Sequence, residues 1–106
     1  MSGWKSLESP KLRVPLELRE VTTPDVPARV WEVQELRKGA VFKVTLDRHV
    51  LKSSLPRAGL TEAEVERAVC LAVEESLLSP PDKEPGLTYE VPVTPEAIQE
   101  ATEISV

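Results

Sequence analysis

Asp47 and His49 could form the carboxylate–imidazole pair that many enzymes use for proton transfer. The two residues are two positions apart, so in a strand both side chains lie on one face. A carboxylate that orients a histidine is an element of general acid–base catalysis. His49 is the single histidine of the chain, however, and the spacing provides no nucleophile to accompany the pair. We interpret both side chains as part of a solvated sheet face and assign no catalytic residue.

Cys70 is the single cysteine, and it lies in the apolar middle of a predicted helix, where a thiol is an inert core group. One cysteine and one histidine cannot form a thiolate or imidazole metal cluster. The glycines lack the spacing of a phosphate-binding loop. Glu62, Glu64 and Glu66 spread around a helix instead of converging on a cation. The sequence therefore predicts neither a metal site nor a cofactor.

Charge is divided unequally between the two parts of the chain. Residues 1–60 carry 11 Lys and Arg against 7 Asp and Glu, a net charge of +4. Residues 61–106 carry 2 basic against 11 acidic side chains, a net charge of −9, and the sum is −5. Asymmetry of this kind is typical of proteins that bind a charged partner.

Length and composition indicate one globular domain. A chain of 106 residues with 41% hydrophobic side chains can bury a core without disulfides. We expect residues 1–10 to be a flexible N-terminal tail and residues 11–106 to be a single domain. The longest apolar run, residues 68–73, is far shorter than the ~20 residues of a membrane helix, and no targeting segment is recognised. A cytoplasmic protein without membrane contact is expected.

The chain has no Asn, but it has 15 Glu and 10 Pro. Few thermolabile and many charged residues are typical of heat-adapted proteins. A GC-rich genome that favours Arg, Glu, Ala and Pro codons gives the same composition, so both explanations stay open.

Alternating apolar residues predict four strands, at residues 12–19, 29–36, 42–50 and 87–93. Pro15 and Pro92 each remove a ladder donor, which favours edge positions for the first and fourth strands. Gly39, after Arg37 and Lys38, suits a hairpin loop that needs positive φ. The side chains expected on the core face are Leu12, Val14, Leu16, Leu18, Trp31, Val33, Phe42, Val44, Leu46, Val50, Leu87, Tyr89, Val91 and Val93.

Two helices are predicted, over residues 62–78 and from Pro95 to about residue 102. Thr61 and Glu64 have the spacing of a capping box, and Leu60 with Val65 has that of a hydrophobic staple. Thr94 is an N-cap residue before a proline at the first helical position.

The order β-β-β-α-β-α predicts an α+β fold of two layers. One mostly antiparallel four-stranded sheet has one long and one short helix on one face. The strand order 1-2-3-4, with the last strand parallel to the third, keeps both prolines at edges. The order 4-1-2-3 would place Pro15 where a ladder bond is needed, and it remains the alternative.

The long helix has a second apolar line. One broad arc, centred on Val69 and Val73, must cover the sheet, but Leu71 and Leu78 lie on the opposite, charged face beside Arg67 and Glu74. Two leucines seven residues apart on a charged face need a second surface to cover them. That surface is either the short C-terminal helix, through Ile98, Ala101 or Ile104, or a partner protein; simple exposure is the third reading.

Basic residues in the first part of the chain raise the question of nucleic acid. Arg48, Lys52 and Arg57 would supply the contacts, near the end of the third strand. A phosphate-binding surface needs contiguous positive charge with aromatic side chains for stacking, and both are scarce in a chain of pI near 4.9. Nucleic acid is therefore not the partner that the sequence favours.

Together these patterns favour a non-enzymatic module that binds protein, most simply itself as a homodimer or higher oligomer. The residues expected at the interface are Leu71, Leu78, Arg67 and Glu74. The first alternative is a small regulatory, antitoxin-like domain that binds nucleic acid through Arg48, Lys52 and Arg57. The second is a small-molecule enzyme whose site forms between protomers.

Overall fold

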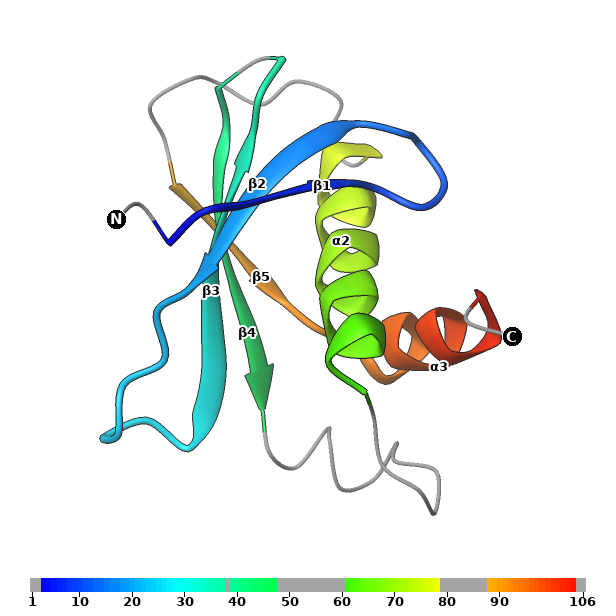
Figure 1. The fold of residues 1–106 in the computed structure, drawn as a ribbon. Coiled ribbons are helices and arrows are strands. Elements are labelled where there is room, and N and C mark those ends of the chain that lie inside the picture. The colour runs from blue at the N-terminus through cyan, green and yellow to red at the C-terminus, as the bar shows by residue number, and fades with distance from the viewer. Residues whose placement is uncertain (1–2, 38, 48–60, 79–87, 105–106) are drawn as a thin grey trace.

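The computed structural model describes residues 3–37, 39–47, 61–78 and 88–104. In these ranges the elements follow the order β1 (Lys5–Glu8), β2 (Pro15–Glu20), β3 (Ala28–Glu35), β4 (Val41–Asp47), α2 (Glu62–Leu78), β5 (Thr88–Pro92) and α3 (Pro95–Ile104). The strands form one sheet in the order β1-β2-β3-β4-β5. Helix α2 lies across the sheet, and α3 lies beside α2 (Figure 1). The predicted α+β class is confirmed.

The sheet is mixed. Strands β1 to β4 pair antiparallel, and β5 pairs with β4 in parallel. The predicted parallel pairing of the last strand is therefore confirmed, as is its place at an edge. Pro92, in β5, is exposed there, where its missing N–H costs no ladder bond.

The predicted count of four strands is wrong by one, because residues 5–8 form β1 inside the segment expected to be a tail. This strand pairs Lys5 with Leu18 and Leu7 with Leu16. It offers only one large apolar side chain, Leu7, so its pattern is too short to detect by alternation. Residues 5–8 are held as a strand by their pairing with β2, which the sequence pattern alone does not indicate.

Strand β1 also corrects two expectations for the strand that follows it. The strand that contains Pro15 is second in the sheet, not at an edge. Pro15 is tolerated because it is the first residue of β2. Leu12, expected in the core, is 40% exposed, because the chain turns between β1 and β2 with Arg13 at φ 57°. Val14, Leu16 and Leu18 are buried as predicted.

The core lies between the sheet and α2. Strand β4 alternates as predicted, with Phe42, Val44 and Leu46 buried. Trp31 and Val33 of β3 are buried on the same side. Val50 and Leu87, also expected on the core face, lie outside the described residues.

Both helices begin at the predicted caps. The Thr61 N–H donates to Oε1 of Glu64 at 2.9 Å, and the Glu64 N–H donates to Oγ1 of Thr61 at 3.2 Å, which is the reciprocal capping box. In α3, the Ala97 N–H donates to Oγ1 of Thr94 at 3.2 Å. Leu60, the expected staple partner of Val65, lies outside the described residues. Helix α2 has the predicted bounds, and α3 extends to Ile104.

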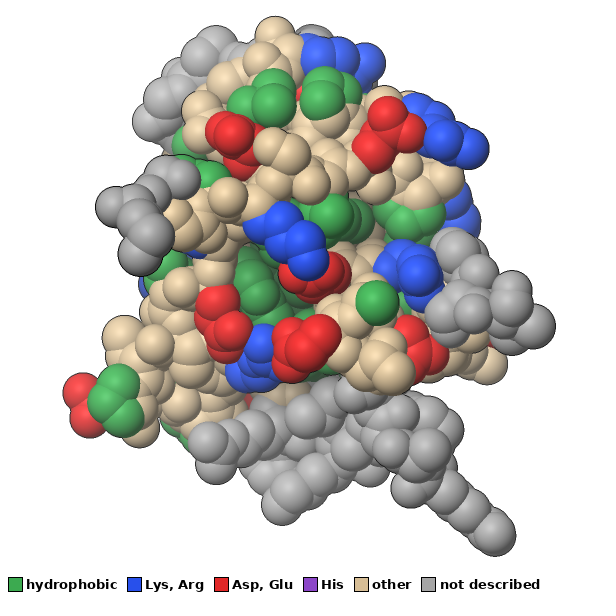
Figure 2. All heavy atoms as spheres, in the orientation of Figure 1, with side chains coloured by type: hydrophobic (Ala, Val, Ile, Leu, Met, Phe, Trp, Pro, Cys, Tyr) green, Lys and Arg blue, Asp and Glu red, His purple; other side chains and the backbone are tan. Residues whose placement is uncertain are grey.

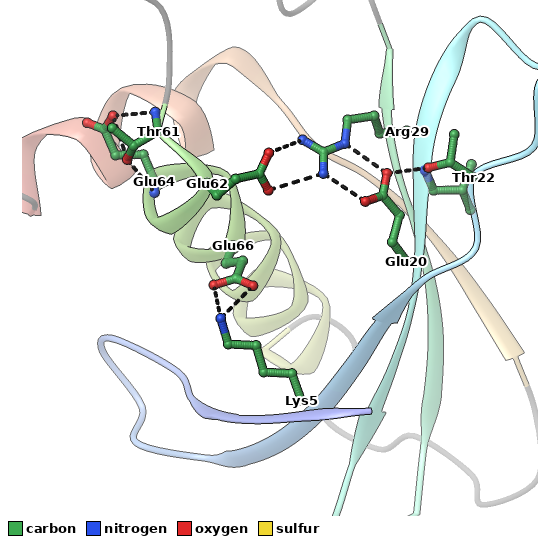
Figure 3. A network of polar contacts seen from close by, with 9 residues as sticks. Lys5, Glu20, Thr22, Arg29, Thr61, Glu62, Glu64 and Glu66 are labelled. Carbon is green, nitrogen blue, oxygen red and sulfur yellow. Dashed lines mark hydrogen bonds and ion pairs between the residues drawn. The ribbon is translucent and has the colours of Figure 1, made fainter. Parts of the chain in front are cut away.

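One arginine joins α2 to two strands of the sheet (Figure 3). Arg29 of β3 donates to both carboxylate oxygens of Glu20 at 2.8 and 2.9 Å, and to those of Glu62 at 3.1 and 3.2 Å. Its guanidinium lies 4.9 Å from the ring centroid of Trp31. Hydrogen bonds from Arg29 lower the pKa of Glu20 from 4.5 to about 2. Lys5 of β1 makes a second link to α2, through Glu66 at 2.8 Å.

These contacts give a structural meaning to the unequal charge of the sequence. Lys5 and Arg29 belong to the basic part of the chain, and their partners Glu66 and Glu62 belong to the acidic part. Figure 2 shows acidic and basic side chains interspersed on this face, with apolar side chains between them. Part of the unequal charge of the sequence is therefore paired in ion pairs within one chain. Neither described helix is long and apolar enough to cross a membrane.

Thr61→Ala should lower the free energy of unfolding by about 1 kcal/mol, because the variant leaves the Glu64 N–H without its side-chain acceptor. Urea unfolding followed by circular dichroism measures the change. Thr23→Ala, at an exposed loop position, is the matched control. A Thr61→Ala effect no larger than that of the control would show that the cap contributes nothing to stability.

Acid should weaken the fold through Glu20. Since its pKa is about 2 when folded and near 4.5 when unfolded, the unfolded chain takes up the proton first as the pH falls. The stabilising contribution is complete above pH 4.5 and disappears as the pH approaches 2. Glu20→Gln should therefore be less stable than wild type at pH 6, and the two should converge near pH 2 in urea titrations. A difference that stays constant over this range would contradict the assignment.

Candidate functional site

Three of the four residues expected at an interface line one groove. Leu71, Glu74 and Leu78 of α2 are joined there by residues of α3 and of the turn between β1 and β2. The hollow has a volume of about 180 Å³. We call it the Leu78 groove, and its lining residues are Lys11, Leu12, Leu71, Glu74, Glu75, Leu78, Ala97 and Glu100.

The groove has an apolar floor and exposed apolar walls. Leu71 is buried at 4% exposure, whereas Leu12 is 40% and Leu78 is 65% exposed. Leu78 is the last residue of α2. Of the two leucines on the second apolar line of α2, one is therefore covered within the chain. The other, Leu78, remains on the surface and lines the groove together with Leu12.

Leu12 reaches the surface because of the turn that precedes β2. The Ser9 N–H donates to the Val14 carbonyl at 3.1 Å, and the Arg13 N–H donates to the Ser9 carbonyl at 3.2 Å. The hydroxyl of Ser9, itself buried, accepts from the Val14 N–H at 2.9 Å. These bonds close a tight turn that presents Lys11 and Leu12 toward α2.

Glu74 joins this turn to α2 through hydrogen bonds. Its Oε2 accepts the backbone N–H groups of Lys11 at 2.9 Å and Leu12 at 2.6 Å. The residue is only 3% exposed. Its other oxygen, Oε1, is buried and has no hydrogen-bond partner within the described ranges. A buried carboxylate oxygen without a donor is costly, and a nearby positive charge reduces that cost.

Acidic side chains predominate at the groove. Three carboxylates, of Glu74, Glu75 and Glu100, face one cation, Lys11. Lys11 forms an ion pair with Glu100. Its pKa is raised by the hydrogen bond to Glu100 and further by the negative charges of Glu74 and Glu75. The groove therefore favours an occupant that is apolar and positively charged.

Arg67, the fourth expected interface residue, lies apart from the groove. Its Nη1 donates to the carbonyl of Ala101 in α3 at 3.0 Å. It lines a separate hollow together with Leu7, Pro10 and Cys70. Its observed contact therefore joins α2 to α3 within the chain.

The other residues considered in the sequence for catalysis or nucleic-acid binding are a buried thiol, an exposed carboxylate at a strand end and residues outside the described ranges. Burial raises the pKa of Cys70 to about 12, with a smaller effect from Glu74, so the thiol is protonated at neutral pH. Asp47 ends β4 on an exposed position, while His49 lies outside the described residues. Arg48, Lys52 and Arg57, the alternative nucleic-acid contacts, also lie outside them. Among the described residues no three His, Cys, Asp or Glu side chains gather as metal ligands.

The sequence did not indicate the part of the groove that comes from other elements. Lys11, Leu12, Ala97 and Glu100 reach it only through tertiary packing. The clearest signal of the groove in the sequence was Glu74, because this charged residue is surrounded by mostly apolar residues within the helix. A search of family models, of curated proteins and of solved structures found no match to this chain.

Glu74→Ala should lower the free energy of unfolding by about 2 kcal/mol, because the N–H groups of Lys11 and Leu12 lose their acceptor. Glu74→Gln should cost much less, since the amide oxygen still accepts and no buried charge remains. Urea unfolding measures both variants.

Glu75→Ala is the matched control for the Glu74 series, since Glu75 is the next residue along α2 and its side chain is exposed. This substitution should change the free energy of unfolding by less than about 0.5 kcal/mol. Equal effects of Glu74→Ala and Glu75→Ala would contradict the role of Glu74 as the acceptor of the turn.

Proposed function

We propose that this protein works by binding protein, most simply a second copy of itself, and that the Leu78 groove is the docking surface. The observation that carries the proposal is the pair of exposed leucines, Leu12 and Leu78, that line one groove together with the buried Leu71. Apolar side chains gathered in a hollow and rimmed by polar groups are typical of interaction sites.

The construction of the groove supports the same proposal. The Glu74 carboxylate holds the turn of Lys11 and Leu12 in place, so one wall of the groove is fixed before any partner arrives. A surface that is already ordered loses less conformational entropy on binding. The carboxylates at the rim add orientation, because they attract basic and repel acidic surfaces.

Leu78→Glu should weaken self-association at least about tenfold, since it places a charge at the centre of an apolar contact. Sedimentation equilibrium over a range of protein concentrations measures the association constant. Leu78 ends α2 and is 65% exposed, so the variant should keep the circular dichroism spectrum and unfolding midpoint of the wild type.

Val26→Glu is the matched control. Val26 is an exposed apolar residue, at 41%, in the loop between β2 and β3, and it lies outside the groove. The control should associate as the wild type does. A wild-type protein that stays monomeric at every concentration would overturn self-association, and a Leu78→Glu variant that associates normally would overturn the groove as its site.

A further inference from the structure

The occupant of the Leu78 groove can be identified from the chain itself, provided that the proposed self-association holds. We propose that the turn between β3 and β4 of a second copy docks there, with Leu36 in the apolar hollow and Arg37 against the carboxylates. We call Leu36 and Arg37 the hairpin tip. Both partners do this at once, so each copy gives its tip and receives the tip of the other.

The hairpin tip complements the groove in both apolar character and charge. Leu36 is an exposed apolar residue, at 45%, and the Arg37 side chain is 59% exposed. Lys38 follows in the sequence. One leucine joined to basic residues complements a groove that contains leucines and three carboxylates. The guanidinium of Arg37 would also bring positive charge near the buried Glu74 carboxylate, whose Oε1 has no donor among the described residues.

The tip is held in a defined shape. The Glu35 N–H donates to the Ala40 carbonyl at 2.8 Å, and the Gly39 N–H donates to the Glu35 carbonyl at 2.8 Å. Gly39 has φ 74°, which a turn of this kind requires. The buried carboxylate of Glu35 accepts the Arg37 N–H at 2.7 Å and its Nε at 3.3 Å. A guanidinium has five N–H donors, and four of them are on the two Nη atoms, which the bond from Nε does not use.

The positions of tip and groove favour a closed pair. Figure 1 places the β3–β4 turn and the end of α2 at the same end of the molecule. The Leu36 N–H donates to the carbonyl of Pro15 at 3.2 Å, three residues from Leu12 in the groove. Two complementary surfaces at one end can both be satisfied across a single two-fold axis, whereas surfaces at opposite ends would form an open filament.

Exchange of charge between two variants tests the proposal. Arg37→Glu puts an acidic tip against an acidic groove. Glu75→Arg replaces one of the three carboxylates of the groove with a cation, so the lining loses its excess negative charge and presents an added arginine to the basic tip. Each variant alone should associate at least about tenfold more weakly than the wild type, because the first brings like charges together and the second removes the attraction for the tip. An equimolar mixture should form a one-to-one heterodimer, since the acidic tip of one variant then meets the added arginine of the other, and the unchanged tip meets the unchanged groove. Sedimentation equilibrium of the mixture, with one variant carrying a fluorescent label, measures it.

Leu36→Ser is the second test, and it does not depend on charge near the buried Glu35. It should weaken association about tenfold or more, while Val26→Ser, at an exposed apolar residue outside groove and tip, should not. Circular dichroism checks that each variant is folded. If Arg37→Glu fails to fold, the association constant of Leu36→Ser alone tests whether the hairpin tip is the occupant.

The outcomes separate this inference from the function on which it rests. Normal association of the tip variants, together with loss of association in Leu78→Glu, would overturn the hairpin tip as occupant and leave the groove as a docking site. A mixture of Arg37→Glu and Glu75→Arg that stays monomeric would likewise overturn the tip. A monomeric wild type would overturn both proposals.

Discussion

The burial of the middle of α2 on every side is the constraint on which the rest of the structure depends. All residues from Ala68 to Glu74 are buried, which is about two full turns of helix. The sheet covers only one side of such a helix, so α3 and the turn between β1 and β2 must cover the others. Removal of either cover would uncover part of the groove in which Leu71 lies. Removal of the turn would also leave the Glu74 carboxylate without the N–H groups that it binds.

Glu74 makes this arrangement specific. A buried carboxylate is unfavourable unless hydrogen bonds compensate it, and the backbone of Lys11 and Leu12 supplies two. The same contact fixes the segment that β1 and β2 share, and so it places Leu12 at the wall of the groove. Stability and the proposed docking surface therefore depend on one side chain. The groove is a consequence of how the helix is covered.

Charge has two roles in this chain. Arg29 and Lys5 bind the acidic residues Glu62 and Glu66 of α2 and hold the helix on the sheet, so part of the unequal charge of the sequence is paired within one molecule. Among the described residues that line the groove, three carboxylates are accompanied by one cation, Lys11. Their excess over positive charge is what distinguishes the groove from the mixed surface of Figure 2. In the proposed pair of copies, the exposed Arg37 of the hairpin tip supplies the complementary charge.

The sequence by itself determined the local structure: the bounds of α2, the caps at Thr61 and Thr94, and the strands whose alternation is long enough to detect. It also placed Leu71 and Leu78 on a second apolar line of α2, because helical periodicity depends on neighbours along the chain. Only the tertiary structure decided that residues 5–8 form a strand, that Leu12 is exposed and that Leu71 is covered while Leu78 is not. Each of these depends on contacts between residues far apart in sequence, such as Glu74 with Leu12 at a separation of 62 residues. No periodicity encodes such a contact, since only packing of the helix against the turn brings the two residues together.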